Sequence, residues 1–407
     1  MYYALCEDVY LVKGCAKSCI YDLKSSRLYS VNNFLSQEIE LINQGKIQEN
    51  DVEEELKTIL TDFIQLGILE KRDRPVIRDI HDIKEESVVC KFAWIEITSK
   101  CNLKCKHCYN ESDVQAHNVM SLSDFKRVVD ILVKMKIPRI QIIGGEPFFH
   151  KKTLKSMLDY AIGKFEFIEI FTNGTLITDE WFDYLKCNNI HIALSVYSYD
   201  SVMHDNVTKV NGSFDKTNRT IGLLRQRSIS YRVCNVLMKD IDLGTTKSDL
   251  FVLSDERDIV RMSGRANFRL LSDDLIRKKL ITRHTFQKPV SKAFCKRLIS
   301  GHNCFKDKIY ISANLDVYPC VMERRLKHCT IDEQNKIVLN NKIRFLTKDE
   351  VEECSNCEYR YACYDCRPNS LSGAIYEKPW YCTYHPQTGE WENANVFIEK
   401  LKKEWGE

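Results

Sequence analysis

The sequence SKCNLKCKHCYNES, residues 99–112, places three cysteines within eight positions: Cys101, Cys105 and Cys108. A structural zinc site takes four tetrahedral ligands, and a disulfide takes two cysteines. Three thiolates held together therefore indicate a metal centre with one coordination position left open. The alternative is a structural zinc loop that takes its fourth ligand from a distant part of the chain.

The cysteine loop lies in a region, residues 90–285, where strand and helix patterns alternate. One clear helix pattern starts at residue 121, with Ser121 as N-cap and Phe125, Val128 and Leu132 on one face. Repeated βα units imply a parallel sheet, and six of them predict an α/β fold with a partial (βα)6 TIM-type barrel. The six predicted strands are residues 92–98, 139–144, 167–174, 191–197, 231–238 and 266–271. The cysteine loop directly follows the first strand, at the edge where such sheets bind ligands.

Polar residues and glycines follow the next three predicted strands. The second strand is followed by Gly144, Gly145 and Glu146, the third by Asn173, and the fourth ends near Ser195. Two glycines allow backbone to approach a ligand closely, and a carboxylate can accept from an amino group. We expect these groups to share one rim with the three cysteines. A Gly-Gly pair alone is equally typical of an ordinary turn.

A second group of eight cysteines follows the predicted barrel, in residues 286–407. Eight thiolates suit two centres with four ligands each, and two-residue spacings serve zinc and iron–sulfur clusters equally. A pair of zinc ribbons is therefore the alternative. The eight are Cys295, Cys304, Cys320, Cys354, Cys357, Cys363, Cys366 and Cys382. The neighbouring Tyr364, Asp365 and Arg367 are candidates to tune a cluster or, equally, plain surface residues.

The sequence pattern of residues 1–75 predicts a separate unit of three short strands followed by two helices. The strands cover residues 9–14, 17–23 and 27–32, with helices at 33–45 and 52–69. This order predicts a winged-helix-like α+β peptide-binding domain, or else a cap without a binding role. Residues 76–89 are charged and predict a linker to the barrel.

Composition limits the function classes. The chain has 407 residues, with 60 Lys+Arg against 57 Asp+Glu and a net charge of +3, which does not favour nucleic-acid binding. The start of the chain lacks a signal-peptide layout, and no run of 18 apolar residues predicts a membrane span. We therefore expect a cytoplasmic protein without nucleic-acid or membrane partners. In a reducing compartment its 18 cysteines are metal ligands or buried thiols rather than disulfides.

The region 90–285 resembles the radical S-adenosylmethionine (SAM) superfamily. The spacing Cys101-x3-Cys105-x2-Cys108, with His107 before the last cysteine, resembles its cluster loop, and GGEP at 144–147 resembles its second motif. The resemblance implies a [4Fe-4S] cluster whose fourth iron is chelated by SAM and whose electron yields a 5′-deoxyadenosyl radical. It also implies that SAM contacts Gly144, Gly145, Glu146, Asn173, Ser195 and His107.

Residues 286–407 resemble the SPASM domain, the auxiliary-cluster extension of radical peptide-modifying enzymes. The resemblance rests on NLDVYPCVM and CSNCEYRYACYDCRP, and it departs from the family at Leu315 and in the short Cys363–Cys366 spacing. It implies two auxiliary [4Fe-4S] clusters. One would be bound by Cys354, Cys357, Cys363 and Cys382, and the other by Cys295, Cys304, Cys320 and Cys366.

Residues 1–75 resemble the PqqD-like RiPP recognition element, which binds the leader of a ribosomal precursor peptide. The resemblance implies that the leader adds a strand at residues 27–32. Together the three parts resemble maturases that form thioethers in Cys-rich peptides of the sactipeptide and ranthipeptide type. An electron donor such as flavodoxin or ferredoxin is then a second partner.

Four alternatives remain open from the sequence. They are radical carbon–carbon or carbon–oxygen cross-linking, epimerisation, formylglycine formation of the anaerobic sulfatase type, and a non-enzymatic zinc scaffold. No residue stands out as a general base, and the substrate carbon is not predicted.

Overall fold

A computed structural model describes residues 1–85, 87–245, 247–256, 258–364, 366–369 and 374–406. The chain forms two compact units, each assembled from separate stretches of sequence. The first contains residues 1–88, 280–303 and 345–407, and the second contains residues 89–279 and 304–344. None of the described helices is long and apolar enough to cross a membrane.

An eight-stranded sheet forms the centre of the second unit, in the order β10-β9-β8-β7-β6-β11-β12-β13. Strands β6 to β11 pair in parallel, and β12 and β13 extend the sheet in antiparallel pairing. Isoleucines of β6 to β8 alternate with the buried polar residues Glu96, Gln141 and Glu169, so one face of these strands is apolar and the other carries polar groups. The strands are β6 (Phe92–Thr98), β7 (Arg139–Gly144), β8 (Phe167–Thr172), β9 (His191–Ser195), β10 (Tyr231–Cys234), β11 (Lys308–Ile311), β12 (Asp316–Tyr318) and β13 (Cys329–Thr330).

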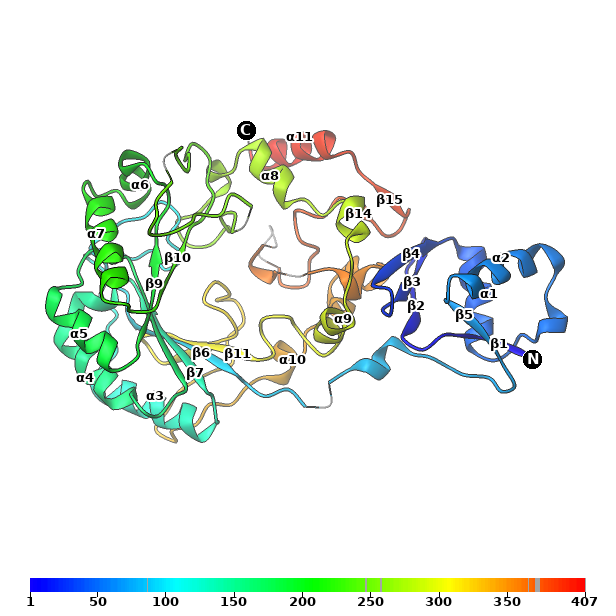
Figure 1. Cartoon of the computed structure of the whole chain (residues 1–407), viewed down its shortest axis with the longest axis horizontal. Coiled ribbons are helices and arrows are strands. Elements are labelled where there is room, and N and C mark those ends of the chain that lie inside the picture. The colour runs from blue at the N-terminus through cyan, green and yellow to red at the C-terminus, as the bar shows by residue number, and fades with distance from the viewer. Residues whose placement is uncertain (86, 246, 257, 365, 370–373, 407) are drawn as a thin grey trace. The chain divides into compact units, whose positions relative to one another are not determined.

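Helices α3 to α7 lie along one face of this sheet (Figure 1). The predicted N-cap of α3 is confirmed, because the Ser121 hydroxyl accepts from the Asp124 N–H at 3.0 Å. Phe125, Val128 and Leu132 of α3 are buried in the core, as predicted. The helices of this unit are α3 (Leu122–Lys134), α4 (Lys151–Ala161), α5 (Asp179–Cys187), α6 (Ser201–Thr208), α7 (Ser213–Gln226), α8 (Asp273–Lys279) and α10 (Asn341–Arg344).

Five of the six predicted barrel strands are present, and the sixth prediction is wrong. Residues 266–271 contain a 3-10 turn, Phe268–Leu270, in place of a strand. The Asn267 side chain accepts from the Arg269 N–H at 3.1 Å, so a local polar bond competes with strand pairing. The sixth parallel strand is β11, which pairs with β6 on the side away from β7.

The N-terminal part of the first unit contains the predicted strands and helices. Strands β2 (Val9–Lys13), β3 (Ser18–Asp22) and β4 (Arg27–Val31) form an antiparallel sheet in which β4 is an edge strand. Helices α1 (Asn33–Asn43) and α2 (Glu54–Gln65) pack on it through a core that includes Ile20, Ile39 and Leu60. The sequence prediction did not include β1 (Tyr2–Leu5) and β5 (Leu69–Arg72), which pair with each other.

The rest of the first unit has little regular structure and packs against the β2–β3 turn. The Cys15 N–H donates to the Asn356 carbonyl at 2.8 Å, and the Tyr21 hydroxyl donates to the Glu358 carbonyl at 2.9 Å. The N-terminal sheet therefore contacts the cysteine-rich segment directly. This part contains α9 (Lys292–Ile299), β14 (Tyr384–His385), β15 (Glu390–Trp391) and α11 (Ala394–Glu404).

Candidate functional site

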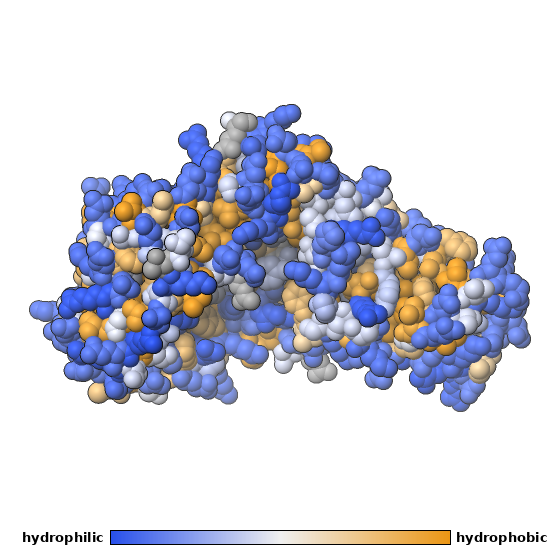
Figure 2. Space-filling model, turned by 45° about the horizontal axis from the view of Figure 1, so that its top comes forward, coloured by the Kyte–Doolittle hydropathy of each residue, from blue (hydrophilic) through white to orange (hydrophobic). Residues whose placement is uncertain are grey.

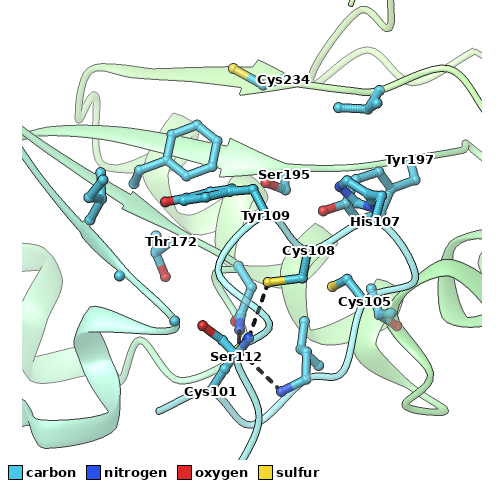
Figure 3. Close-up of a pocket in the computed structure, with 18 of the residues that line it drawn as sticks. Cys101, Cys105, His107, Cys108, Tyr109, Ser112, Thr172, Ser195, Tyr197 and Cys234 are labelled. Carbon is cyan, nitrogen blue, oxygen red and sulfur yellow. Dashed lines mark hydrogen bonds between the residues drawn. The ribbon is translucent and has the colours of Figure 1, made fainter. Parts of the chain in front are cut away.

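Cys101, Cys105 and Cys108 line one cavity of about 210 Å³ at the carboxyl ends of the parallel strands. Figure 3 shows Cys105 and Cys108 on the same loop, with Ser195 and Tyr197 on the strand side of the cavity. The loop follows β6, as predicted, and its three thiols face a common space. Three thiols on one cavity wall suit a centre with several metal atoms, because a cluster spans more space than a single ion.

Backbone N–H groups hold two of the thiols in place. The Leu103 N–H donates to Cys101 Sγ at 3.3 Å, and the Ser112 N–H donates to Cys108 Sγ at 3.4 Å. Hydrogen bonds to ligand sulfurs are one of the means by which proteins tune iron–sulfur centres.

A segment distant in sequence clamps the cysteine loop. Arg265 donates from Nε to the Cys105 carbonyl at 2.9 Å and from Nη2 to the Ser112 carbonyl at 2.8 Å. The preceding Gly264 has φ +60°, and a Cβ there would stand 2.3 Å from the Cys108 carbonyl oxygen. Only glycine permits this approach, so both residues fix the shape of the loop.

The Gly-Gly turn packs directly against the start of the cysteine loop. The Gly145 N–H donates to the Thr98 carbonyl at 2.7 Å, and a Cβ on Gly145 would lie 2.2 Å from the Lys100 carbonyl oxygen. Gly144 and Gly145 both line the cavity, as predicted.

Glu146 is fully buried behind the cavity wall rather than among its lining residues. Its carboxylate accepts from the Thr172 hydroxyl at 2.6 Å and from the Asn173 N–H at 2.8 Å. Burial raises the pKa of this carboxyl group, and those hydrogen bonds oppose the shift. Glu146 thus ties the Gly-Gly turn to the end of β8, and its predicted contact with SAM stays a prediction.

The other predicted cofactor residues, Asn173, Ser195 and His107, all line the cavity. Asn173 Nδ2 lies 3.8 Å from Cys101 Sγ. The His107 ring meets Tyr197 edge to face at 4.9 Å, and its Nδ1 is buried without a hydrogen-bond partner among the described residues. Burial, with Arg265 nearby, lowers the pKa of His107 to about 4, so the ring is neutral at pH 7. Its unpartnered nitrogen is available to a bound ligand.

The donor set fits an iron–sulfur cluster. Burial, followed by the neighbouring Cys108, raises the pKa of Cys105 to about 12, and burial followed by Glu146 raises that of Cys101. Crowded, buried thiols ionise only when a cation compensates their charge, and a cluster supplies that charge. Among the described residues, no three His, Cys, Asp or Glu side chains stand close enough to hold a single metal ion.

The first unit brings four further predicted ligands together around one small cavity. Cys354, Cys357, Cys363 and Cys382 line it. Burial raises the pKa of Cys357 and of Cys382, and in both cases Cys363 adds to the shift. The buried Lys348 places Nζ 2.9 Å from Cys363 Sγ. Four thiols with a cation beside them suit one four-ligand cluster.

The remaining four predicted ligands are divided between the units. Cys295 and Cys366 belong to the first unit, and Cys304 and Cys320 belong to the second. That they share one cluster stays a prediction. Arg367 is fully buried and donates from Nη1 to the Ile375 and Glu377 carbonyls, both at 2.8 Å, so it orders the local chain. Tyr364 is exposed, and Asp365 lies outside the described residues.

Sequence reasoning missed three residues of these cavities: Arg265, Lys348 and Cys234. Arg265 lies in an irregular segment and Lys348 in a single 3-10 turn, Lys348–Glu350, so no periodicity marks either residue. Cys234 ends β10 opposite Ser195 and lines the cavity with the three loop cysteines. Cys234 falls inside the predicted strand 231–238, so the sequence offered no signal for it.

Comparison with known proteins agrees with this site. Residues 95–241 match the Radical SAM superfamily. Residues 95–241, which contain the three cysteines and the Gly-Gly turn, therefore form a radical SAM domain.

Two relatives share parts of this region. The antilisterial bacteriocin subtilosin biosynthesis protein AlbA of Bacillus subtilis is 38% identical over 143 residues, which are 35% of this chain and 32% of AlbA. An AdoMet-dependent heme synthase of Nitratidesulfovibrio vulgaris is 28% identical over 168 residues, 41% of this chain and 46% of that protein. The matches thus span less than half of the length of each of these relatives.

A solved structure resembles nearly the whole chain. Streptococcus suis SuiB bound to precursor peptide SuiA matches with a TM-score of 0.52 and 14% identity, covering 93% of this chain and 98% of SuiB. At this level of identity the likeness shows the fold.

Proposed function

We propose that this protein is a radical SAM enzyme that forms Cys thioether cross-links in a ribosomally synthesised, Cys-rich precursor peptide. The observation that carries the proposal is the cavity that Cys101, Cys105 and Cys108 share with Gly144 and Gly145 in the radical SAM domain. When bound there, a [4Fe-4S] cluster and SAM supply a 5′-deoxyadenosyl radical that abstracts hydrogen from unactivated carbon.

The chain's own residues would ligate the cluster, orient SAM and shield the reacting carbon from water. Cys101, Cys105 and Cys108 would hold the cluster through their thiolates. The carbonyls of Gly144 and Gly145 are acceptors suited to the amino group of SAM, since the N–H of Gly145 is already bonded to Thr98. His107 Nδ1 and the Ser195 hydroxyl offer further polar contacts. The cavity wall, with Phe171, Ile143 and Val236, excludes water from the reacting carbon.

Anaerobically purified protein should convert SAM to 5′-deoxyadenosine when a strong reductant is added. The expectation follows from the open coordination position, which allows the cofactor to bind and receive an electron. Chromatography of the reaction, together with iron and sulfide assays, measures it. Protein that carries zinc and no sulfide, and that produces no nucleoside, would be a scaffold and would contradict the proposal.

The N-terminal part of the first unit is proposed to bind the leader of the precursor peptide. Its sheet ends in the edge strand β4, whose backbone can pair with an extended peptide. Apolar side chains are exposed on the same part, including Phe34 at 62% and Leu66 at 53%. Figure 2 shows apolar residues gathered on its surface, at the right. Exposed apolar patches of this kind mark interaction sites.

Addition of the precursor peptide should slow hydrogen exchange of the β4 amides, residues 27–31. Strand addition would pair β4 amides on the side that has no strand partner among the described residues, and paired amides exchange more slowly. Mass spectrometry of peptic fragments measures the effect, and the leader-free core peptide is the control. Equal exchange at β4 with and without a peptide that the enzyme still processes would remove the leader-binding role.

Thioether formation balances in hydrogen and electrons. The radical removes one hydrogen atom from the acceptor carbon, the substrate thiol loses a proton, and its sulfur bonds to that carbon. One electron must then leave. The proposed sink is an auxiliary cluster held by Cys354, Cys357, Cys363 and Cys382, where Lys348 offers positive charge beside a ligand sulfur.

Other radical reactions on a peptide are the second candidates: carbon–carbon or carbon–oxygen cross-linking, epimerisation, and formylglycine formation. The similarity to an AdoMet-dependent heme synthase makes a porphyrin a further candidate substrate. The edge strand and the exposed apolar residues of the first unit favour a peptide over either a folded sulfatase or a porphyrin.

A further inference from the structure

A second hollow in the second unit is lined in part by Asn102 of the cysteine loop. It is a shallow surface depression of about 570 Å³. Asn102, from between two cluster cysteines, forms part of its wall, and Phe149, His150, Lys151 and Lys152 line it where α4 begins. This depression opens to solvent and is separate from the cavity that contains the predicted SAM contacts.

The depression is one residue away from a cluster ligand. Asn102 Oδ1 accepts from Asn173 Nδ2 at 3.0 Å, and the same Nδ2 lies 3.8 Å from Cys101 Sγ. Asn102 Nδ2 in turn donates to the Thr175 hydroxyl at 2.8 Å, which holds the side chain in place. An electron carrier seated in the depression would therefore reach the cluster without entering the substrate cavity.

Uncompensated positive charge surrounds the depression. No carboxylate among the described residues lies within ion-pair distance of Lys100, Lys151 or Lys152. Lys100 is close enough to His150 to lower the pKa of its ring, in addition to the larger effect of burial. Lys104, on the loop itself, forms an ion pair with Asp113 at 3.8 Å and does not belong to this uncompensated charge.

The placement of two of these cations is unfavourable for the helix that carries them. Lys151 and Lys152 occupy the first turn of α4, where the helix dipole favours negative charge, and no acidic residue or side-chain cap offsets them. By contrast, α3 and α5 have Asp124, Asp179 and Glu180 in their first turns. An anionic partner at Lys151 and Lys152 would relieve this repulsion.

We propose that this depression and its lysine rim are the docking surface for a small acidic electron-transfer protein. The inference rests on the proposed function, which requires one electron from outside for each SAM cleaved. That electron leaves the donor, which is oxidised by one electron, and reduces the cluster by one electron. No bond forms or breaks at the surface. Complementary charge would steer the encounter and set the orientation.

The test is the double charge reversal Lys151→Glu/Lys152→Glu in the cluster-loaded, full-length protein. Stopped-flow absorbance follows reduction of the clusters by flavodoxin hydroquinone at low and high salt. We expect the variant to be reduced at least about tenfold more slowly at low salt and to lose most of its salt dependence. SAM cleavage driven by dithionite should keep its wild-type rate, because that reductant needs no protein docking.

The matched control is Lys216→Glu/Lys336→Glu, which changes net charge equally at two exposed lysines outside the depression. Wild-type reduction by flavodoxin in the Lys151/Lys152 variant would overturn the proposal. Equal slowing with both reductants, or equal slowing in the control, would overturn it too, because the defect would then lie in the cluster or in net charge. Wild-type protein without iron–sulfur absorbance would instead refute the proposed function itself.

Discussion

Replacement of Cys101, Cys105 and Cys108 together by alanine should abolish 5′-deoxyadenosine formation while most of the iron remains. These three thiols line the cavity of the radical SAM domain, and the other predicted ligands lie elsewhere in the sequence. Iron should fall by about four atoms of about twelve per chain, on the usual count of four irons per four-ligand site. Iron and sulfide assays with chromatography of the nucleoside measure both effects.

A matched control for this variant removes three other cysteines. Cys6, Cys187 and Cys329 lie outside both cysteine-lined cavities. Their joint replacement by alanine should leave iron content and nucleoside production unchanged. Unimpaired cleavage in the Cys101/Cys105/Cys108 variant would refute the assignment of the radical cluster. Loss of all iron would mean that the auxiliary clusters depend on the first one.

Local pattern predicted the radical domain well, because its signals are short-range. The cysteine loop, the Gly-Gly turn and the strand ends at Asn173 and Ser195 each follow one strand, and parallel strands bring their carboxyl ends to one edge. The cap of α3 and its apolar face are likewise set by neighbours within two turns. Such features depend on little beyond their own segment.

Features that depend on distant segments were not predicted. Arg265 clamps the cysteine loop across more than 150 positions of sequence, through backbone carbonyls that carry no residue-specific signal. The sixth strand was expected at residues 266–271, where Asn267 closes a local turn instead, and β11 takes its place beside β6. Lys348 contacts Cys363 from a single 3-10 turn. The periodicity of apolar residues carries no information about contacts between distant segments.

The contact between the N-terminal sheet and the cysteine-rich segment also joins residues that are far apart in the sequence, and it was not predicted. Residues 1–75 form the expected strands and helices, yet every residue of β3 is buried. One reason is that Tyr21 packs onto Glu358, next to the predicted ligand Cys357. A deletion of residues 1–75 would therefore expose the surroundings of an auxiliary ligand. Hydrogen exchange at β4 tests leader binding without that damage.

Loss of one auxiliary ligand should separate SAM cleavage from cross-linking. In Cys363→Ala the radical domain is intact, so 5′-deoxyadenosine should still form at least in part, but the electron released on thioether formation has no sink. Wild-type product should be lighter by two hydrogens per cross-link and should lose one alkylatable cysteine for each. Mass spectrometry after iodoacetamide labelling measures the ratio of cross-link to nucleoside, which should fall nearly to zero in the variant.

Lys348→Met provides the matched control, because it keeps all four thiols and nearly the same side-chain length. Removal of the cation 2.9 Å from Cys363 Sγ should lower the reduction potential of the auxiliary cluster, since positive charge and hydrogen bonds to sulfur stabilise the reduced state. Redox titration followed by electron paramagnetic resonance measures that shift. The ratio of cross-link to nucleoside should lie between those of wild type and Cys363→Ala.

A wild-type ratio of cross-link to nucleoside in Cys363→Ala would exclude this cluster as the electron sink. A loss of two hydrogens with every cysteine still alkylated would indicate a carbon–carbon or carbon–oxygen bond, and an unchanged mass would indicate epimerisation.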